Sequence, residues 1–269
     1  MNHYISVIKR KAKTAQRLLS SGDLRALNVG FKRNICFIGN RVKAIPYYVY
    51  ADLEDRRTGG KCTNRVIASK HYDQGAHDLQ NSDYRCIDQL FKAVPLRSDD
   101  VFVDVGCGEA RVLTWHDRHG FRGRLIGIEL DEEIASRAAR RVEHCKNAEI
   151  IHKNILDCSD VIRDGTAFFL FNSFNGKVLK SFIEMVEKNC RNGVRLYYFC
   201  DYGRSLIDCR EGWKILWRGK VTRPPWNDLP ATIYEYVCQG DVSAAAPYRA
   251  QPSAARLLAR SSSAVTSAE

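Results

Sequence analysis

The sequence predicts an α/β fold: a doubly wound, mainly parallel sheet of seven strands, with helices on both faces and an antiparallel last strand. First, strand-like and helix-like patterns alternate between residues 72 and 239, as in sheets whose parallel strands are joined by helices. Second, the run VFVDV at 101–105 has the character of a buried strand that enters a glycine turn. Third, the strand-like runs 213–219 and 231–237 follow one another without a helical pattern between them, so we expect them to pair antiparallel.

The individual elements follow in chain order. The expected strands are 101–105, 124–129, 148–152, 167–172, 194–200, 213–219 and 231–237. The expected helices are one marked by Ile87, Leu90, Phe91 and Val94, then 109–118, 132–145 and 176–189. Ser82 is the candidate N-cap of the first helix, because a serine oxygen can accept from free backbone N–H groups. Asp131 opens the helix at 132, and the two glutamates after it suit the positive end of the helix dipole.

Composition divides the chain into three parts. Residues 1–70 form a basic N-terminal extension with 15 lysines and arginines against 4 aspartates and glutamates, which accounts for the whole net charge of +11. Residues 71–239 are balanced in charge and form the predicted α/β domain. Residues 240–269 contain 9 alanines and 6 serines. This tail is predicted to be disordered, because it cannot bury enough apolar surface to offset the entropy of ordering.

An amphipathic helix is predicted within residues 1–20. Apolar residues recur at helical spacing from Tyr4 to Leu19, with lysines and arginines between them. Such a helix can lie on an anionic membrane surface, which would place the protein at the inner face of a membrane. It can equally pack on the main domain with its cationic side in water. The basic extension also leaves nucleic-acid binding open, with an affinity that would fall steeply with salt.

Other classes of protein are disfavoured. The longest apolar runs, such as FFLF at 168–171, are far shorter than the roughly 20 residues of a membrane span. The first residues lack the apolar core and the cleavage site of a signal peptide. The ten cysteines show no recognised metal spacing. We therefore expect no metal site and a reducing, cytoplasmic setting.

A carboxylate precedes the glycine turn after the first strand. Asp104 stands two residues before Gly106, and Gly108 follows. A dinucleotide-binding fingerprint would have its third glycine at the position of Arg111. A carboxylate at this place also repels a diphosphate, because like charges repel at short range. The pattern therefore favours a cationic, hydroxyl-bearing ligand over a pyridine dinucleotide.

The segment VDVGCGEARV resembles the first motif of class I S-adenosylmethionine-dependent methyltransferases. Three further segments resemble later motifs of that family in the expected order: GIELD at 127–131, KNILD at 153–157 and FFLFNSFN at 168–175. The resemblance covers most of the middle domain. It implies a seven-stranded Rossmann-like fold, S-adenosyl-L-methionine as the cofactor, and methyl transfer as the activity.

The resemblance assigns contacts with the methionine part of the cofactor. Gly106 and Gly108 would let the backbone approach it, where a Cβ would obstruct. Asp104 would orient its amino group. Upstream, the segment 79–84 stands where relatives carry residues that cover the cofactor, and Tyr84 is its candidate cofactor contact, together with Ser82.

The same resemblance assigns contacts with the nucleoside part. Glu129 would accept hydrogen bonds from the two ribose hydroxyls, which suit a carboxylate with two acceptor oxygens. Leu130 and Ile155 would enclose the adenine ring between apolar surfaces. Asn154 stands where the family commonly has Asp, and its side-chain oxygen would accept from the adenine amino group.

The segment 171–174 concerns the methyl acceptor. It loosely resembles the Asn/Asp-Pro-Pro-aromatic motif of methyltransferases that act on planar amines, but both prolines are absent, which disfavours nucleic-acid bases. It is closer to the Asn-x-Phe pattern of non-SET lysine methyltransferases and of small bacterial relatives with unassigned substrates. Asn172 would then hold an acceptor N–H or O–H beside the cofactor, and Phe174 would wall the acceptor channel.

Four other residues are weaker candidates for the acceptor side. Asp201 and Tyr202 follow the fifth strand and could line the pocket or simply form a turn. His71 and His77 could act as mobile bases or be solvated loop histidines. Two functions stay open: an enzyme that methylates an N or O acceptor on a protein or a small molecule, and a non-catalytic module that keeps the cofactor pocket. A nucleic-acid methyltransferase that uses the basic extension is a further alternative.

Overall fold

The computed structural model of the chain describes residues 43–62, 66–189, 193–225 and 227–237. The amphipathic helix predicted within residues 1–20 and the tail predicted to be disordered lie outside these residues. No helix in the described ranges is both long and apolar enough to cross a membrane.

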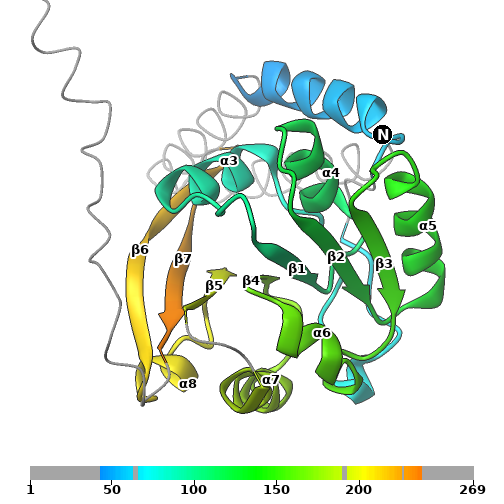
Figure 1. Ribbon diagram of the computed structural model, residues 1–269. Coiled ribbons are helices and arrows are strands. Elements are labelled where there is room, and N and C mark those ends of the chain that lie inside the picture. The colour runs from blue at the N-terminus through cyan, green and yellow to red at the C-terminus, as the bar shows by residue number, and fades with distance from the viewer. Residues whose placement is uncertain (1–42, 63–65, 190–192, 226, 238–269) are drawn as a thin grey trace, which may run out of the picture. The chain divides into compact units, whose positions relative to one another are not determined.

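A seven-stranded sheet forms the frame of the domain (Figure 1). Its strands are β1 (Val101–Val105), β2 (Arg124–Glu129), β3 (Ala148–His152), β4 (Ala167–Phe171), β5 (Val194–Phe199), β6 (Trp213–Arg223) and β7 (Asn227–Tyr236). Their order across the sheet is β3-β2-β1-β4-β5-β7-β6. The first five run parallel, and β7 is antiparallel to both of its neighbours. The predicted fold class is therefore confirmed, and it is the fold that the resemblance to class I methyltransferases implies.

Helices cover both faces of this sheet (Figure 1). They are α3 (Tyr84–Ala93), α4 (Arg111–Arg118), α5 (Glu132–Val142), α6 (Ser159–Asp164), α7 (Gly176–Asn189) and the short α8 (Ser205–Asp208). Successive strand residues point to opposite faces, so β1 supplies Phe102 to the core under α3, α4 and α5, and Val103 and Val105 to the core under α6 and α7. The side chains on both faces of these strands are buried, which explains why the strands are apolar along their length.

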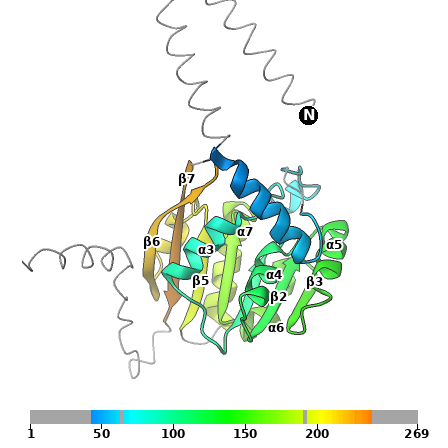
Figure 2. The ribbon, with the colours of Figure 1, turned by 90° about the horizontal axis from the view of Figure 1, so that it is seen from above.

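A further helix, over residues 43–57, lies on the face that carries α3, α4 and α5 (Figure 2). Its buried Asp55 accepts hydrogen bonds from Arg111 of α4 and from the hydroxyl of Tyr84 of α3. Just after this helix, the carbonyl of Thr58 accepts from Arg141 of α5 at 2.8 Å. Part of the segment assigned to the N-terminal extension is thus packed against the α/β domain.

The sequence predicts the N-cap residues of two helices. One of these predictions is confirmed and the other is wrong. The carboxylate of Asp131 accepts from the backbone N–H of Ile134 at 3.1 Å, as expected of the N-cap of α5. Ser82 does not cap α3, because that helix begins at Tyr84 with Asp83 as its N-cap. The carbonyl of Ser82 instead accepts a hydrogen bond from Arg111.

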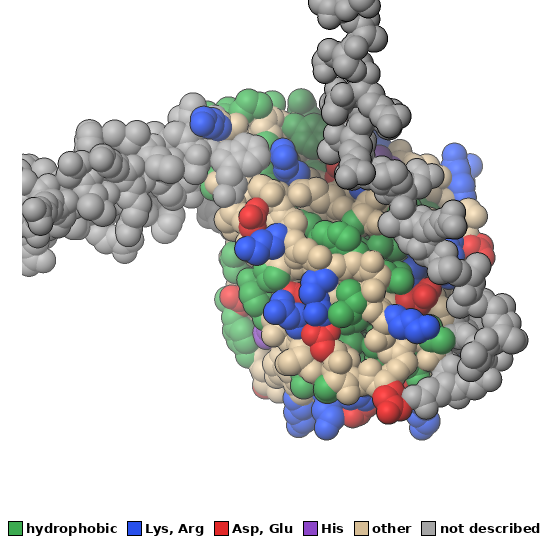
Figure 3. All heavy atoms as spheres, turned by 90° about the vertical axis from the view of Figure 1, so that its left-hand side faces the viewer, with side chains coloured by type: hydrophobic (Ala, Val, Ile, Leu, Met, Phe, Trp, Pro, Cys, Tyr) green, Lys and Arg blue, Asp and Glu red, His purple; other side chains and the backbone are tan. Residues whose placement is uncertain are grey.

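One edge of the sheet is the strand β6, which forms a long hairpin with β7. The side chains of Lys214, Arg218 and Lys220 on β6 reach water. Figure 3 shows this side of the molecule, where charged side chains of both signs are interspersed with hydrophobic ones. Charges along an edge strand disfavour pairing with another chain, because they would have to be desolvated.

Candidate functional site

A pocket lies at the carboxyl ends of β1, β2 and β4. This is where the strand order turns back on itself, between β1 and β4, and open α/β sheets bind their ligands at such a switch point. Eight of the residues predicted to form the site line this pocket: Asp104, Gly106, Gly108, Glu129, Leu130, Asn154, Ile155 and Phe174. The folded chain therefore brings together residues that are up to 70 positions apart in sequence.

Asp104 is the most unusual group in the pocket. Only 3% of its surface is exposed, and its Oδ2 atom has no hydrogen-bond partner among the residues that the structure describes. Burial, and then the neighbouring Glu129, raise the pKa of Asp104 to about 8. A buried carboxyl oxygen without a partner is costly, and a cationic ligand would relieve that cost.

Glu129 is held at the end of β2 by three backbone N–H groups. Its Oε2 accepts from Gly108 at 2.9 Å, and its Oε1 accepts from Leu130 at 2.8 Å and Asp131 at 3.0 Å. Burial raises the pKa of Glu129, although these three N–H groups act in the opposite direction. The glycine turn after β1 and the end of β2 are thus joined by a direct hydrogen bond. One more acceptor position remains on the carboxylate, which has about four.

The two glycines of the turn are required by the packing of the protein around the pocket. Gly106 has φ +75°, and a Cβ on it would lie 2.9 Å from Cβ and Oγ of Ser173. Gly108 has φ +54°, and a Cβ on it would lie 2.5 Å from the side chain of Leu79. The missing side chains therefore make room for residues of the protein that border the pocket.

The nucleoside end of the predicted site is formed by apolar and amide groups. Leu130 and Ile155 both border the pocket. The side-chain oxygen of Asn154 accepts from the backbone N–H of Leu156 at 3.0 Å and so caps the short 3₁₀ helix Ile155–Asp157. An amide oxygen has two lone pairs, so this cap uses half of its accepting capacity.

A loop over residues 66–82 borders the pocket on its open side. It is closed on itself by an antiparallel bridge between Ile67 and Leu79, and it pairs with the segment after β4 through a bridge between Ala76 and Phe174. The part from Leu79 to Ser82 lines the pocket, as predicted for a segment that covers a ligand. This loop directly precedes α3 in the sequence, so the segment that borders the pocket is part of the same chain segment as the first helix of the α/β domain.

Asn172 and Tyr84 are not where the sequence prediction puts them. Asn172 does not line the pocket; it has a left-handed φ of +47°, a conformation that Asn adopts more readily than most residues, and its backbone carbonyl accepts a hydrogen bond from His77. Tyr84 also lies outside the pocket, because its hydroxyl donates to Asp55 at 2.8 Å inside the helical layer. The structure thus uses Asn172 as a turn residue and Tyr84 as a packed aromatic.

His77 lines the pocket, and both its ring and its backbone are hydrogen-bonded to the segment after β4. Its Nδ1 lies 2.9 Å from the carbonyl oxygen of Asn172, and its backbone N–H donates to the carbonyl of Ser173 at 3.1 Å. A carbonyl can only accept, so in the neutral ring Nδ1 carries the hydrogen and Nε2 carries the free lone pair. The carbonyl group that fixes this tautomer belongs to a residue 95 positions away, so the sequence alone could not show the contact.

The other candidates have different positions. His71 borders the pocket, with its Nε2 3.7 Å from the carboxylate of Asp131. Asp201 is buried outside the pocket and accepts from the hydroxyl of Thr232. Tyr202 is 68% exposed and also lies outside the pocket. Asp201 and Tyr202 therefore belong to the turn after β5 and not to the candidate site.

No protein-family model and no curated protein matches this chain. Solved structures match it at low similarity. An RNA methyltransferase from Salinibacter ruber, in complex with S-adenosyl-L-homocysteine, has 16% identity and a TM-score of 0.45, and the match covers 64% of this chain and 100% of that one. The N-methyltransferase NodS from Bradyrhizobium japonicum, also in complex with S-adenosyl-L-homocysteine, has 14% identity and a TM-score of 0.45, with 56% and 85% covered. At these values the similarities assign neither a substrate nor a cofactor to this chain.

Proposed function

We propose that this chain is an S-adenosyl-L-methionine-dependent methyltransferase that acts on an N or O acceptor of a protein or a small molecule. The observation that carries the proposal is the buried Asp104, whose Oδ2 has no partner at the edge of a pocket. Together with the resemblance of the four sequence motifs, this carboxyl favours an adenosyl ligand with a cationic amino acid part. When bound, this cofactor supplies an already activated methyl group.

The residues around the pocket suit the parts of such a cofactor. Asp104 would pair with its ammonium group, since a buried carboxylate is stabilised by an opposite charge. Glu129, already oriented by backbone N–H groups, would use its remaining acceptor position for a ribose hydroxyl. Leu130 and Ile155 would border the adenine ring on its apolar faces.

The acceptor side of the pocket contains a group that can take a proton. An N or O acceptor that arrives protonated must lose a proton when it is methylated, and histidine is the side chain most often used to accept it. His77 is suited to this role, because the carbonyl of Asn172 holds Nδ1–H and leaves the lone pair on Nε2. Phe174, which lines the same pocket, would wall the acceptor channel as expected from the sequence.

A methyl-transfer screen tests the enzyme against the non-catalytic module. The purified protein is incubated with cofactor carrying a labelled methyl group, and with protein, small-molecule and nucleic-acid fractions of a lysate as acceptors. We expect transfer by the wild type, and a loss of about 100-fold or more in His77→Gln, which is the usual range for a positioned base. Cofactor affinity, measured by calorimetry, should be nearly the same in both.

A matched control is His119→Gln. The Nδ1 of His119 is likewise held by a carbonyl, that of Trp115 at 2.7 Å, but His119 lies outside the pocket. This variant should retain full transfer. If the wild type binds the cofactor but methylates nothing in any fraction, the chain is a binding module. If His77→Gln transfers as fast as the wild type, His77 is not the base.

A further inference from the structure

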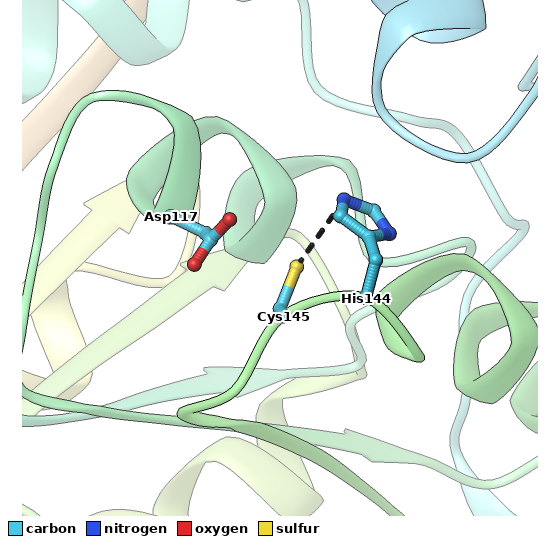
Figure 4. A group of neighbouring side chains, drawn as sticks. All are labelled: Asp117, His144 and Cys145. Carbon is cyan, nitrogen blue, oxygen red and sulfur yellow. Dashed lines mark hydrogen bonds between the residues drawn. The ribbon is translucent and has the colours of Figure 1, made fainter.

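A second group of reactive side chains lies away from the pocket. Asp117, in α4, and His144 and Cys145, between α5 and β3, bring an oxygen, a nitrogen and a sulfur atom within 4.8 Å of one another (Figure 4). Within the described ranges, this is the one such group of three that could hold a metal ion. The spacing of these residues in sequence matches no metal motif, which is why the sequence predicted no metal site.

The separation of two of these atoms already fits a tetrahedral metal ion. The Sγ atom of Cys145 lies 3.6 Å from Nε2 of His144. A zinc ion has bonds of about 2.3 Å to sulfur and about 2.0–2.1 Å to nitrogen. Two such bonds at the tetrahedral angle separate sulfur and nitrogen by about 3.6 Å. The pair therefore needs little rearrangement to bind one ion.

The third ligand approaches from a different element. Figure 4 shows the carboxylate of Asp117 and the ring of His144 on opposite sides of the Cys145 sulfur. Cys145 is buried, whereas Asp117 is half-buried and His144 is exposed. A buried sulfur beside two more exposed side chains, each with a ligand atom within 4.8 Å of the others, is thus the geometric basis of the site.

We propose that Asp117, His144 and Cys145 bind a zinc ion. Thiolate, imidazole and carboxylate are the three ligand types that zinc accepts in proteins. Calcium and magnesium instead require mostly oxygen ligands. Three protein ligands leave a fourth tetrahedral position, which water would fill.

The site lies away from the pocket, where a bound ion would connect two elements of the fold. Asp117 is in the last turn of α4, which leads away from the pocket, and Cys145 precedes β3. Both residues therefore lie near the amino ends of the strands, whereas the pocket lies at the carboxyl ends. An ion there would tie the end of α4 to the turn between α5 and β3. The proposal is independent of the proposed enzymatic function.

Metal titration of the full-length protein tests the zinc site. Cobalt(II) is added to the reduced protein while thiolate-to-metal charge-transfer absorption is recorded, and zinc affinity is then measured by competition with a chromogenic chelator. We expect one equivalent of bound ion with a charge-transfer band, and zinc that displaces cobalt. Cys145→Ser should abolish the band.

Two further variants separate loss of a ligand from loss of folding. His144 is exposed, so His144→Ala should fold normally and weaken zinc binding by at least about tenfold, the loss that even an outer partner of a metal ligand causes. Cys209→Ser changes an exposed thiol elsewhere in the domain and should leave both the band and the affinity unchanged. A wild type without a charge-transfer band, or a band that persists in Cys145→Ser, would overturn the proposal.

Discussion

The guanidinium group of Arg111 binds the carboxylate of Asp55 through two hydrogen bonds, of 3.0 and 2.7 Å. Both side chains are almost fully buried, with 6% and 0% of their surfaces exposed. Arg111 stands where a dinucleotide-binding fingerprint would have its third glycine, and Asp55 belongs to the helix over residues 43–57. The departure from that fingerprint therefore has a structural use, because it anchors an additional helix to α4.

The ion pair between Asp55 and Arg111 leads to a prediction for the free energy of unfolding of Asp55→Asn. Asp55→Asn removes the carboxylate that pairs with the buried Arg111, and removing one partner of a buried pair costs about 3–5 kcal/mol. We expect the free energy of unfolding, measured in urea, to fall by that amount. Asp88→Asn, which breaks an exposed pair with Lys92 on α3, should leave it nearly unchanged. Equal stabilities of the two variants would contradict the anchoring role of Asp55.

The pKa of Asp104 predicts how stability depends on pH. Its pKa is raised to about 8 in the folded protein from 3.8 in the unfolded chain. Between these values the folded state holds a proton that the unfolded state has lost, so stability falls as pH rises from about 4 to 8. Asp104→Asn removes this penalty. The variant should gain stability relative to the wild type as pH rises through that window, as measured by urea unfolding at each pH, whereas a difference independent of pH would argue against a perturbed carboxyl.

The basic N-terminal extension predicts an interaction with anionic membranes, which we propose for residues 1–20. Full-length protein should sediment with vesicles that contain phosphatidylserine and not with purely neutral vesicles, and added salt should release it. A chain that lacks residues 1–20 should stay in the supernatant. If the full-length protein ignores both kinds of vesicle but binds RNA in a salt-dependent way, the extension serves nucleic acid instead.

The sheet could be predicted from the sequence because its signals are local. Strands such as β1 and β4 are short apolar runs, and the cap of α5 at Asp131 is adjacent to the helix that it begins. The helix over residues 43–57 was not predicted, because its run AIPYYVY is rich in aromatic and β-branched residues. The contact between Asp55 and Arg111, 56 positions apart, holds it on the domain.

The same distinction explains the errors in the candidate site. Motif residues at strand ends, such as Asp104 and Glu129, reach the pocket because parallel strands end at one edge of the sheet. The left-handed φ of Asn172 cannot be inferred from residue types, and the pocket lining does not include this residue. Tyr84 and His77 are fixed by partners that are distant in sequence, Asp55 and Asn172. Local patterns could not show either partner.

The central claim is that the carboxyl group of Asp104 selects a cationic adenosyl ligand. Isothermal titration with S-adenosyl-L-methionine, and separately with NAD as a control ligand of different charge, tests it most directly. The wild type should bind the first and not the second. Asp104→Asn should weaken binding by about 10- to 100-fold, the value of a hydrogen bond to a charged group, whereas Asp201→Asn, which changes a buried aspartate outside the pocket, should not. Undiminished binding by Asp104→Asn, or binding of NAD by the wild type, would contradict the account.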